Sequence, residues 1–412
     1  METHLADFIK DTPEGKEAEA ILRACVHCGF CTATCPTYQL LGDELDGPRG
    51  RIYLMKQVLE GHKPTAKTQL HLDRCLTCRN CETTCPSGVR YGRLVDIGRH
   101  VVEQQVGRAP DERVKRWLLR KSLLSRGLFA GALGAGRLAR SLLPRAVAAK
   151  VLPSRPAGIW PPPRHARRMV ALHGCVQPAL APSIDAAMAR VLDRAGISLV
   201  RAAGSGCCGA VSHHLTAPGE ARAYMRRNID AWWPEIDKGA DAIVVTASGC
   251  GVVVKEYGHL LSDDPLYAAR ARRVAELARD PVEIIAGEWP RLSPMIVTDR
   301  ERQRIAFQSP CTLQHGQKLA GQVERLLKAV GFELTPVADA HLCCGSAGTY
   351  SILHPDLAEQ LKLNKLHSLE AGKPDVIATA NIGCLVHLAS GAQRPVQHWV
   401  ELLDSRLPPV AI

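Results

Sequence analysis

The run C-V-H-C-G-F-C-T-A-T-C-P occupies residues 25–36, and C-L-T-C-R-N-C-E-T-T-C-P occupies residues 75–86. Both read C-x2-C-x2-C-x3-C-P, so one spacing of four cysteines and a proline occurs twice. Structural zinc also uses four thiolates in CxxC pairs, but it needs neither a third closely spaced cysteine nor a trailing Cys-Pro. The repeated run therefore favours an iron–sulfur fold over a zinc fold for the N-terminal part of the chain.

This spacing is typical of ferredoxins that hold two [4Fe–4S] clusters. A loop with a cysteine at every third residue can wrap three corners of an iron–sulfur cube, with backbone N–H groups turned towards the sulfides. The fourth cysteine, before proline, points away and ligates the other cluster. We therefore predict two clusters with these ligands: Cys25, Cys28, Cys31 and Cys85 for one, and Cys75, Cys78, Cys81 and Cys35 for the other.

Composition limits the other classes of function. The chain has 412 residues, 16 cysteines and a net charge of +11. The polar N-terminal sequence METHLADFIKDTPEGKEAEA lacks the apolar core of a signal peptide, and no run of 18 apolar residues suggests a transmembrane helix. We expect a cytoplasmic chain with reduced thiols rather than the disulfide framework of a short secreted protein. Aromatic residues are only 4%, which argues against a stacking platform for single-stranded nucleic acid.

The pattern along the chain predicts four segments: a two-cluster domain over residues 1–108, a basic linker over 109–165, and two cysteine-rich domains over 166–295 and 296–412. From residue 169 onwards, short apolar strands alternate with helical stretches, as in parallel α/β sheets. The expected fold class is therefore a multi-domain α+β protein, with a helical ferredoxin-like domain followed by a duplicated α/β region.

The duplication is visible in the cysteines. Cys175, Cys207 and Cys208 recur 136 residues later as Cys311, Cys343 and Cys344, and Cys250 recurs as Cys384. Strand-like runs precede Cys175, Cys250, Cys311 and Cys384, and ligand sites in parallel sheets lie beyond the carboxyl ends of the strands. We expect four sulfurs at one rim of each half. A further iron–sulfur or metal centre, for which Cys311, Cys343, Cys344 and Cys384 are the candidate ligands, competes with buried structural cysteines and with redox-active thiols.

Three further features are each open to more than one interpretation. Arg49 and Arg51 could stabilise reduced clusters, or they could be surface charges at the start of a helix. His387 lies three residues after Cys384, a metal-ligand spacing, but a satisfied core histidine is the commoner case. The segment from 111 to 168 contains 14 Lys or Arg and two acidic residues, so it could contact a membrane surface, an acidic partner or solvent. It has no nucleic-acid recognition motif, and we expect no nucleic-acid partner.

The chain resembles the iron–sulfur subunits of bacterial glycolate oxidase (glycolate dehydrogenase) over nearly its whole length, except the basic linker. The stretches that carry the resemblance are ILRACVHCGFCTATCPTYQLLGDELDGPRGRIYLMKQVLEG, HLDRCLTCRNCETTCPSGVRYGRLVDIGR, NIDAWWPEIDKGADAIVVTASGCG, HLCCGSAGTYSILHPDLA and TANIGC. The resemblance implies two [4Fe–4S] clusters on the eight ferredoxin-type cysteines and a subunit of a flavin-dependent 2-hydroxy acid oxidoreductase. It also implies flavin-containing partner subunits that carry FAD and the glycolate site, a quinone or other acceptor, and peripheral association with the inner face of the cytoplasmic membrane.

On this interpretation the chain carries electrons and has no catalytic residue of its own. Subunits for lactate or anaerobic glycerol-3-phosphate oxidation have the same plan and remain alternatives. The repeat also resembles the CCG domain of heterodisulfide reductase subunits, so a disulfide reductase subunit is a third alternative. There each full motif ends in CxxC, whereas here the last position is Val253 in the first half and His387 in the second.

Overall fold

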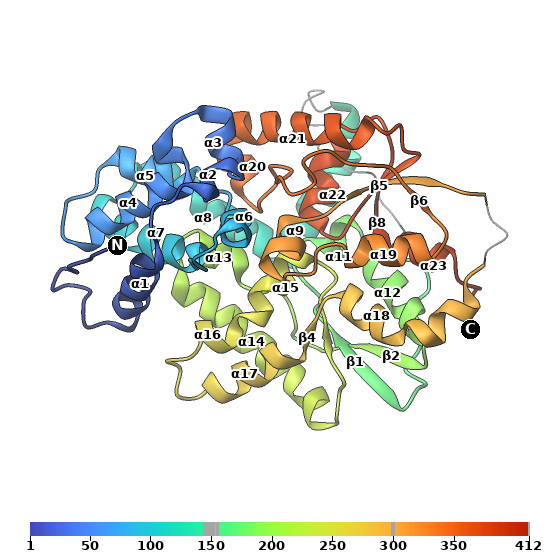
Figure 1. The fold of residues 1–412 in the computed structure, drawn as a ribbon. Coiled ribbons are helices and arrows are strands. Elements are labelled where there is room, and N and C mark those ends of the chain that lie inside the picture. Colours follow the sequence, from blue (N-terminus) through green and yellow to red (C-terminus); the bar gives the residue numbers. More distant parts are fainter. Residues whose placement is uncertain (143–152, 154–155, 298–300, 411–412) are drawn as a thin grey trace.

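Two four-stranded parallel sheets form the larger part of the molecule, and a helical N-terminal domain lies beside them (Figure 1). The structure is a computed structural model, and it describes residues 1–142, 153, 156–297 and 301–410. The predicted fold class, a helical domain followed by a duplicated α/β region with parallel sheets, is confirmed.

The N-terminal domain is built from helices that surround the two cysteine loops. Helix α1 begins with a proline in its first turn, and the Thr12 hydroxyl caps it by accepting a hydrogen bond from the Gly15 N–H. Leu22, Met55 and Leu94 are fully buried in the core of this domain. The helices are α1 Pro13–Ala24, α2 Phe30–Ala33, α3 Pro36–Leu41, η1 Glu44–Asp46, α4 Pro48–Leu59, α5 Ala66–Asp73, α6 Asn80–Thr84 and α7 Tyr91–Val106.

Each half of the duplicated region contains one sheet. The first has the order β2-β1-β3-β4 and the second the order β6-β5-β7-β8, and all neighbouring strands pair in parallel. The chain leaves the first strand of each sheet on one side and returns on the other, which creates a switch point in the strand order. The strands are β1 Arg167–Ala171, β2 Ile197–Arg201, β3 Ile243–Val244, β4 Ala278–Arg279, β5 Arg304–Gln308, β6 Glu333–Leu334, β7 Val376–Thr379 and β8 Val396–His398.

Helices on both faces bury the apolar strands, as parallel sheets require. In the first half they are α11 Gln177–Leu180, α12 Ser183–Arg194, α13 Ala210–His214, α14 Pro218–Asp237, α15 Ser248–Lys255, α16 Tyr257–Leu260, α17 Ala268–Leu277, α18 Pro281–Leu292 and η3 Ser293–Met295. In the second half they are the π-helical turn η4 Thr312–Gly316, α19 Gln322–Ala329, α20 Tyr350–Leu353, α21 Pro355–Glu370, α22 Ile382–Ala389 and α23 Trp399–Ser405.

The two halves share one hydrophobic core. Buried residues from both, including Val244, Phe307 and Trp399, belong to the same cluster of apolar contacts. The loops that follow β3 and β7 also meet, because the Ser248 N–H donates to the Ala380 carbonyl at 3.2 Å. These two loops are equivalent in the repeat, so the halves meet through matching parts.

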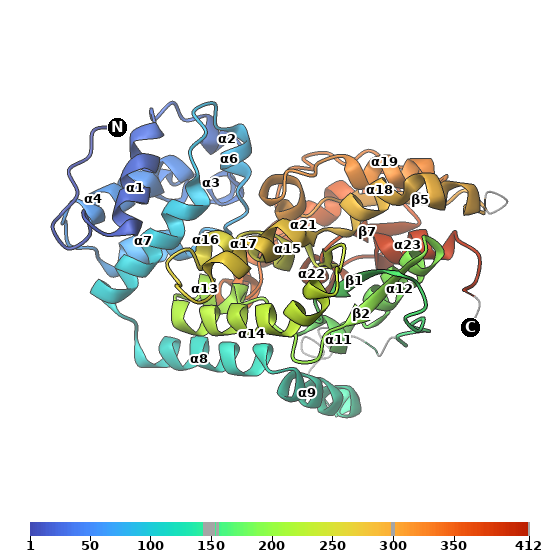
Figure 2. The same ribbon diagram turned by 90° about the horizontal axis from the view of Figure 1, so that it is seen from below.

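Part of the predicted basic linker is regular structure. Residues 110–138 form two helices, α8 Pro110–Leu124 and α9 Arg126–Leu138, which run along the outer side of the first half (Figure 2). The short turn η2 Arg140–Leu142 follows them. Arg126 donates a hydrogen bond to the Ser205 carbonyl at 2.8 Å, so α9 is attached to a loop of the first half.

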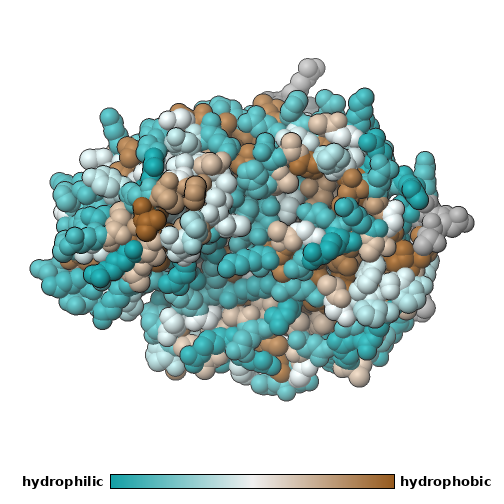
Figure 3. All heavy atoms as spheres, viewed as in Figure 1, coloured by the Kyte–Doolittle hydropathy of each residue, from teal (hydrophilic) through white to brown (hydrophobic). Residues whose placement is uncertain are grey.

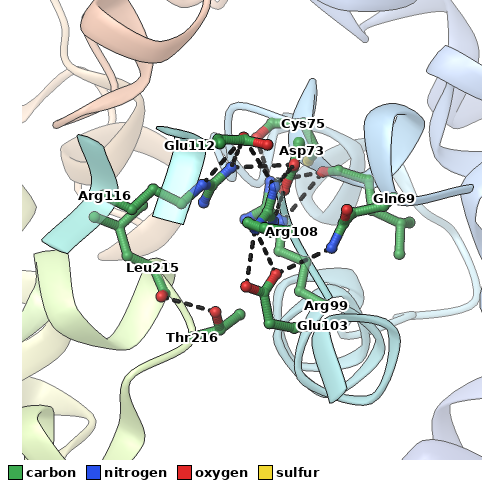
Figure 4. A network of polar contacts seen from close by, with 11 residues as sticks. Gln69, Asp73, Cys75, Arg99, Glu103, Arg108, Glu112, Arg116, Leu215 and Thr216 are labelled. Carbon is green, nitrogen blue, oxygen red and sulfur yellow. Dashed lines mark hydrogen bonds and ion pairs between the residues drawn. The ribbon is translucent and has the colours of Figure 1, made fainter. Parts of the chain in front are cut away.

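A network of charged residues fixes α8 to the N-terminal domain (Figure 4). The buried Arg108 guanidinium contacts three carboxylates: Asp73 at 2.7 Å, Glu103 at 2.6 Å and Glu112 at 3.0 Å. Arg116 also reaches Asp73, at 3.1 Å. Because these side chains come from α5, α7 and α8 and the segments beside them, the network fixes the direction in which the chain leaves the N-terminal domain.

Within the described residues, no helix combines the length and the hydrophobicity needed to cross a membrane. Figure 3 shows a largely hydrophilic face with small hydrophobic groups scattered over it. Exposed apolar side chains on α8 and α9 include Trp117, Leu118 and Leu128.

Candidate iron–sulfur centres

The two cysteine runs of the N-terminal domain have the same backbone shape. In each run, the second and fourth residues after the first cysteine have positive φ angles: 56° at His27 and 86° at Gly29, then 53° at Thr77 and 60° at Arg79. Such turns point successive N–H groups inward and form an anion-binding nest. The Thr77 N–H donates to the Cys75 Sγ at 3.4 Å. The sequence signals this geometry only at Gly29, because the other three residues normally avoid positive φ.

The structure brings Cys85 to the first run, as cross-ligation requires. Cys25, Cys28, Cys31 and Cys85 line one hollow together with Cys81. Burial raises the pKa of Cys31 to about 11, and the neighbouring Cys25, Cys28 and Cys85 add to this effect. In this group Cys28 is exposed and Cys25 is buried. Cys28 is thus the most accessible sulfur of the first group.

The second run gathers with Cys35 in the same way. Burial raises the pKa of Cys81, and Cys78, Cys75 and Cys35 raise it further. The four sulfurs are therefore neighbours, in the combination that the sequence predicts. Their role as cluster ligands stays a prediction.

The chemistry of both groups fits a metal cluster. Buried thiols that raise one another's pKa stay protonated when no cation balances their charge. An iron–sulfur cluster supplies that positive charge, and coordinated thiols are deprotonated. Four soft sulfur donors with backbone N–H groups nearby are the environment that [4Fe–4S] clusters require.

Arg51 lies beneath these loops and is buried, so its interpretation as a surface charge is wrong. It donates hydrogen bonds to the His71 carbonyl at 2.7 Å and to the Thr37 hydroxyl at 3.1 Å, and it pairs with the buried Asp46 at 3.3 Å. Burial alone would lower the pKa of Arg51, but Cys75 and other acidic neighbours raise it overall. Arg49 is partly exposed and pairs with Glu44 at 2.6 Å.

Arg99 on α7 holds the backbone that enters the second run (Figure 4). Its guanidinium donates to the carbonyls of Leu72 at 2.8 Å and Cys75 at 2.6 Å, and to the Thr77 hydroxyl at 2.9 Å. This residue therefore positions the second loop from outside. The sequence contains no motif that singles out Arg99, so it escapes prediction.

In each half of the repeat, four cysteines meet beyond the carboxyl ends of the strands. In the second half, Cys311 Sγ lies 3.9 Å from Cys343 Sγ. A hydrogen bond with Cys343 lowers the pKa of Cys344, but a hydrogen bond with Cys384 and burial together raise it well above its usual value. The first half has the same chain of sulfur contacts, through Cys175, Cys207, Cys208 and Cys250.

The glycine after each cysteine pair has a steric role. Gly209 and Gly345 have φ angles of 89° and 88°. A Cβ on Gly345 would lie 2.6 Å from the Ala358 carbonyl oxygen, and one on Gly209 would lie 2.9 Å from that of Ala221. In each half this glycine lets the cysteine pair approach the following long helix, α14 or α21.

The histidines near these cysteines have their own partners. His387 Nε2 lies 3.2 Å from the Ala358 carbonyl on α21. His315 contacts the Thr83 hydroxyl at 3.0 Å through Nδ1 and the His341 carbonyl at 3.0 Å through Nε2. His315 therefore connects the second cysteine run of the N-terminal domain to the second half.

That contact places two cysteine groups side by side. Burial raises the pKa of Cys78, from the second run, and the nearby Cys311 raises it further; Cys78 in turn contributes to the raised pKa of Cys343. Leu76 and Tyr350 pack in the same apolar cluster. The sequence gives no sign of this proximity, because it arises from the docking of two domains more than 200 residues apart.

Comparisons with known proteins match three stretches of the chain to two families of domains. Residues 21–89 match the 4Fe-4S dicluster domain, and residues 169–255 and 305–389 each match the cysteine-rich domain called CCG. The chain is 57% identical over 409 residues to the glycolate oxidase iron-sulfur subunit of Escherichia coli (strain K12), with 99% of each chain covered.

More distant relatives have similar descriptions. A probable glycolate oxidase iron-sulfur subunit of Bacillus subtilis (strain 168) is 30% identical over 406 residues, covering 91% of this chain and 90% of its own. Lactate utilization protein A of Bacillus licheniformis is 27% identical over 241 residues, covering 56% of this chain and 97% of its own.

Proposed function

We propose a function from one premise: the chain belongs to the family of glycolate oxidase iron–sulfur subunits. It is an electron-transfer subunit of a glycolate oxidase complex. It accepts electrons from a flavin subunit that oxidises glycolate to glyoxylate, and it delivers them towards a quinone or another acceptor. The observation that carries this proposal is the pairing of two four-cysteine groups, each completed by a cysteine from the other run.

The eight ferredoxin-type cysteines are the proposed ligands of two [4Fe–4S] clusters, which supply one-electron redox chemistry when bound. This chain's own residues hold and orient them: the nests at residues 25–29 and 75–79 offer N–H groups, and Arg99 fixes the second loop. We assign residues 1–108 to the domain that holds the clusters and residues 109–165 to the segment that connects it to the repeat. Residues 166–295 and 296–412 are the two CCG domains.

We place FAD and the hydroxy-acid site on partner subunits. The chain is then part of a flavin-dependent 2-hydroxy acid oxidoreductase and contributes no catalytic residue. Because the substrate binds elsewhere, lactate or glycerol-3-phosphate as the donor remains the alternative. The partial match to lactate utilization protein A supports keeping lactate among the substrates tested.

A third redox centre at Cys311, Cys343, Cys344 and Cys384 extends this proposal. Cys78 packs in the same apolar cluster as Cys311 and Cys343, so the second group of the N-terminal domain lies beside the cysteines of the second half. Iron analysis separates the outcomes. About eight atoms per chain means two clusters only, and about twelve means a further [4Fe–4S] centre.

We also propose that the subunit works at the cytoplasmic face of the inner membrane, as a peripheral protein. Support comes from α8 and α9, which expose Val114, Trp117 and Leu128 within a strongly basic segment. Apolar side chains among Lys and Arg suit an anionic lipid surface.

The decisive experiment uses the complex purified without air. Glycolate should bleach the cluster absorbance of the complex, whereas lactate and glycerol-3-phosphate serve as parallel donors that identify the substrate. The isolated chain should not oxidise glycolate with a dye acceptor, because it has no flavin. A colourless chain that contains zinc and no iron would overturn the proposal.

Variants test the ligand assignment. Cys85→Ser and Cys35→Ser should each lower the iron content by up to about four atoms, and each should change the magnetic spectrum of a different centre. Ser87→Ala, on the same loop as Cys85, is the control and should keep all the iron. If neither cysteine variant changes either centre, cross-ligation is wrong.

A further inference from the structure

Three metal-ligating side chains converge away from the cysteine groups, where the N-terminal domain meets the first half. Asp96 lies on α7, and His213 and His214 lie on α13, directly after the first cysteine pair. Asp96 Oδ2 is 3.3 Å from His213 Nε2, and Asp96 Oδ1 is 3.4 Å from His214 Nδ1. One ligand atom from each residue lies within 4.8 Å of the other two. We propose that these residues bind a single zinc ion that joins the two domains.

The distances suit a metal better than hydrogen bonds alone. A charge-assisted N–H···O bond is about 2.7–2.9 Å long. Zn–N and Zn–O bonds of about 2.0–2.2 Å place the ligand atoms of a tetrahedral site about 3.3–3.5 Å apart. The separation of 3.3 Å between Asp96 Oδ2 and His213 Nε2 lies in the second range, and His214 Nδ1 lies 3.4 Å from the other oxygen of the same carboxylate. The rings of His213 and His214 are tilted by 59° to each other, so both can face the same carboxylate.

The carboxylates of Glu256 and Glu82 offset the charges of the two arginines near the site, Arg79 and Arg93. Arg93 and Glu256 act on His213 with opposite signs, and they pair with each other at 3.7 Å. Arg79 also pairs with Glu256, at 2.5 Å. Among the described contacts, the Asp96 carboxylate receives hydrogen bonds only from the two imidazoles.

A second group of carboxylate and imidazole side chains differs from the group at Asp96 in its neighbours. Asp43, Asp46 and His71 also bring their ligand atoms together. There, however, Arg51 and Arg74 already bind Asp46, at 3.3 Å and 2.8 Å. The carboxylate of that group is neutralised by protein cations, so of these two groups the one at Asp96 is the candidate for a metal ion.

Two imidazoles and one carboxylate leave the fourth zinc position to water. The three side chains retain 12% exposure at Asp96, 19% at His213 and 35% at His214, so water can reach the site. Neutral imidazole and carboxylate are ordinary zinc ligands, and the set differs from the all-sulfur groups that suit iron–sulfur clusters. The ion would hold α7 against α13.

The test uses the cluster-loaded full chain, purified without air and freed of loosely bound metal. Equilibrium dialysis against zinc alone, followed by metal analysis, should find one zinc per chain. X-ray absorption at the zinc edge should show nitrogen and oxygen at about 2.0–2.1 Å and no sulfur at about 2.3 Å. Asp96→Asn and His214→Gln should each lower the retained zinc at least tenfold, with the iron content unchanged.

The control is His259→Gln, because His259 also pairs with a carboxylate, Glu17, at 3.2 Å, but belongs to neither candidate group. It should retain zinc like the parent chain. His213→Gln provides a third variant if the substitution at Asp96 impairs folding. A sulfur shell around the zinc, undiminished zinc in the Asp96 and His214 variants, or no zinc at all would each overturn the proposal.

Discussion

At the scale of single residues, Gly345 shows why a glycine must follow the cysteine pair. Alanine at this position would combine a left-handed backbone with a Cβ 2.6 Å from the Ala358 carbonyl oxygen. The backbone conformation alone costs about 1–2 kcal/mol for a residue with a Cβ, and the steric clash adds to this cost.

We expect Gly345→Ala to lower the free energy of unfolding by at least about 2 kcal/mol. The measurement is the midpoint of unfolding in guanidinium, compared with the parent chain. Gly219→Ala is the control, because a Cβ there meets no atom within 4 Å. Equal midpoints for the two variants would contradict the steric argument.

A second residue predicts how stability depends on pH. Burial raises the pKa of Asp185 to about 6, although hydrogen bonds from Thr246 and Gln177 act in the opposite direction. Between about pH 4 and pH 6 the unfolded chain releases this proton while the folded chain keeps it, so stability falls as the pH rises. A pKa difference of about 2 corresponds to about 3 kcal/mol at most.

Asp185→Asn should therefore be more stable than the parent chain at pH 7.5, and the advantage should shrink towards pH 5. The substitution keeps an oxygen acceptor, and both hydrogen bonds go to the same atom, Asp185 Oδ1. Urea unfolding at the two pH values gives the comparison. A pH-independent difference between the chains would show that Asp185 titrates normally.

At the scale of elements, the junction of α5, α7 and α8 depends on one buried arginine. Removing one partner of a buried ion pair typically costs about 3–5 kcal/mol. In Arg108→Met, Asp73 would retain Arg116, so the lower end of this range is expected. Proteolysis within residues 110–138 should accelerate, because α8 loses its attachment. Arg113→Met, an exposed change on the same helix, should leave both measurements unchanged.

Some elements of the fold can be predicted from the sequence, and others cannot. The cysteine spacing predicts which four sulfurs meet in each cluster group, and the strand-like runs place four more at the rim of each sheet. The helices α8 and α9 lie in the segment expected to be a linker. The sequence of α8 has a helix-like apolar periodicity, whereas that of α9 is rich in small residues. Docking contacts such as Thr83 with His315 involve ordinary residues, and no local pattern marks them.

At the scale of the whole molecule, the exposed side of α8 and α9 is the proposed contact with the membrane. Vesicles that contain anionic lipid should bind the chain in flotation, and binding should weaken as salt screens the basic residues. The double variant Trp117→Ser and Leu118→Ser should bind at least several-fold less. Leu266→Ser, which removes an even more exposed apolar side chain outside these helices, should bind like the parent chain. Equal binding by the two would rule out this surface.

The contact between Ser248 and Ala380 has a consequence for the origin of the molecule. Because matching loops of the two halves touch each other, the joint has nearly the symmetry of a homodimer, in which the same patch serves both sides. An ancestor with one half could have paired with its own copy through this patch. Fusion of two gene copies would then have preserved this contact within one chain. The cysteine group of each half could afterwards have changed independently of the other.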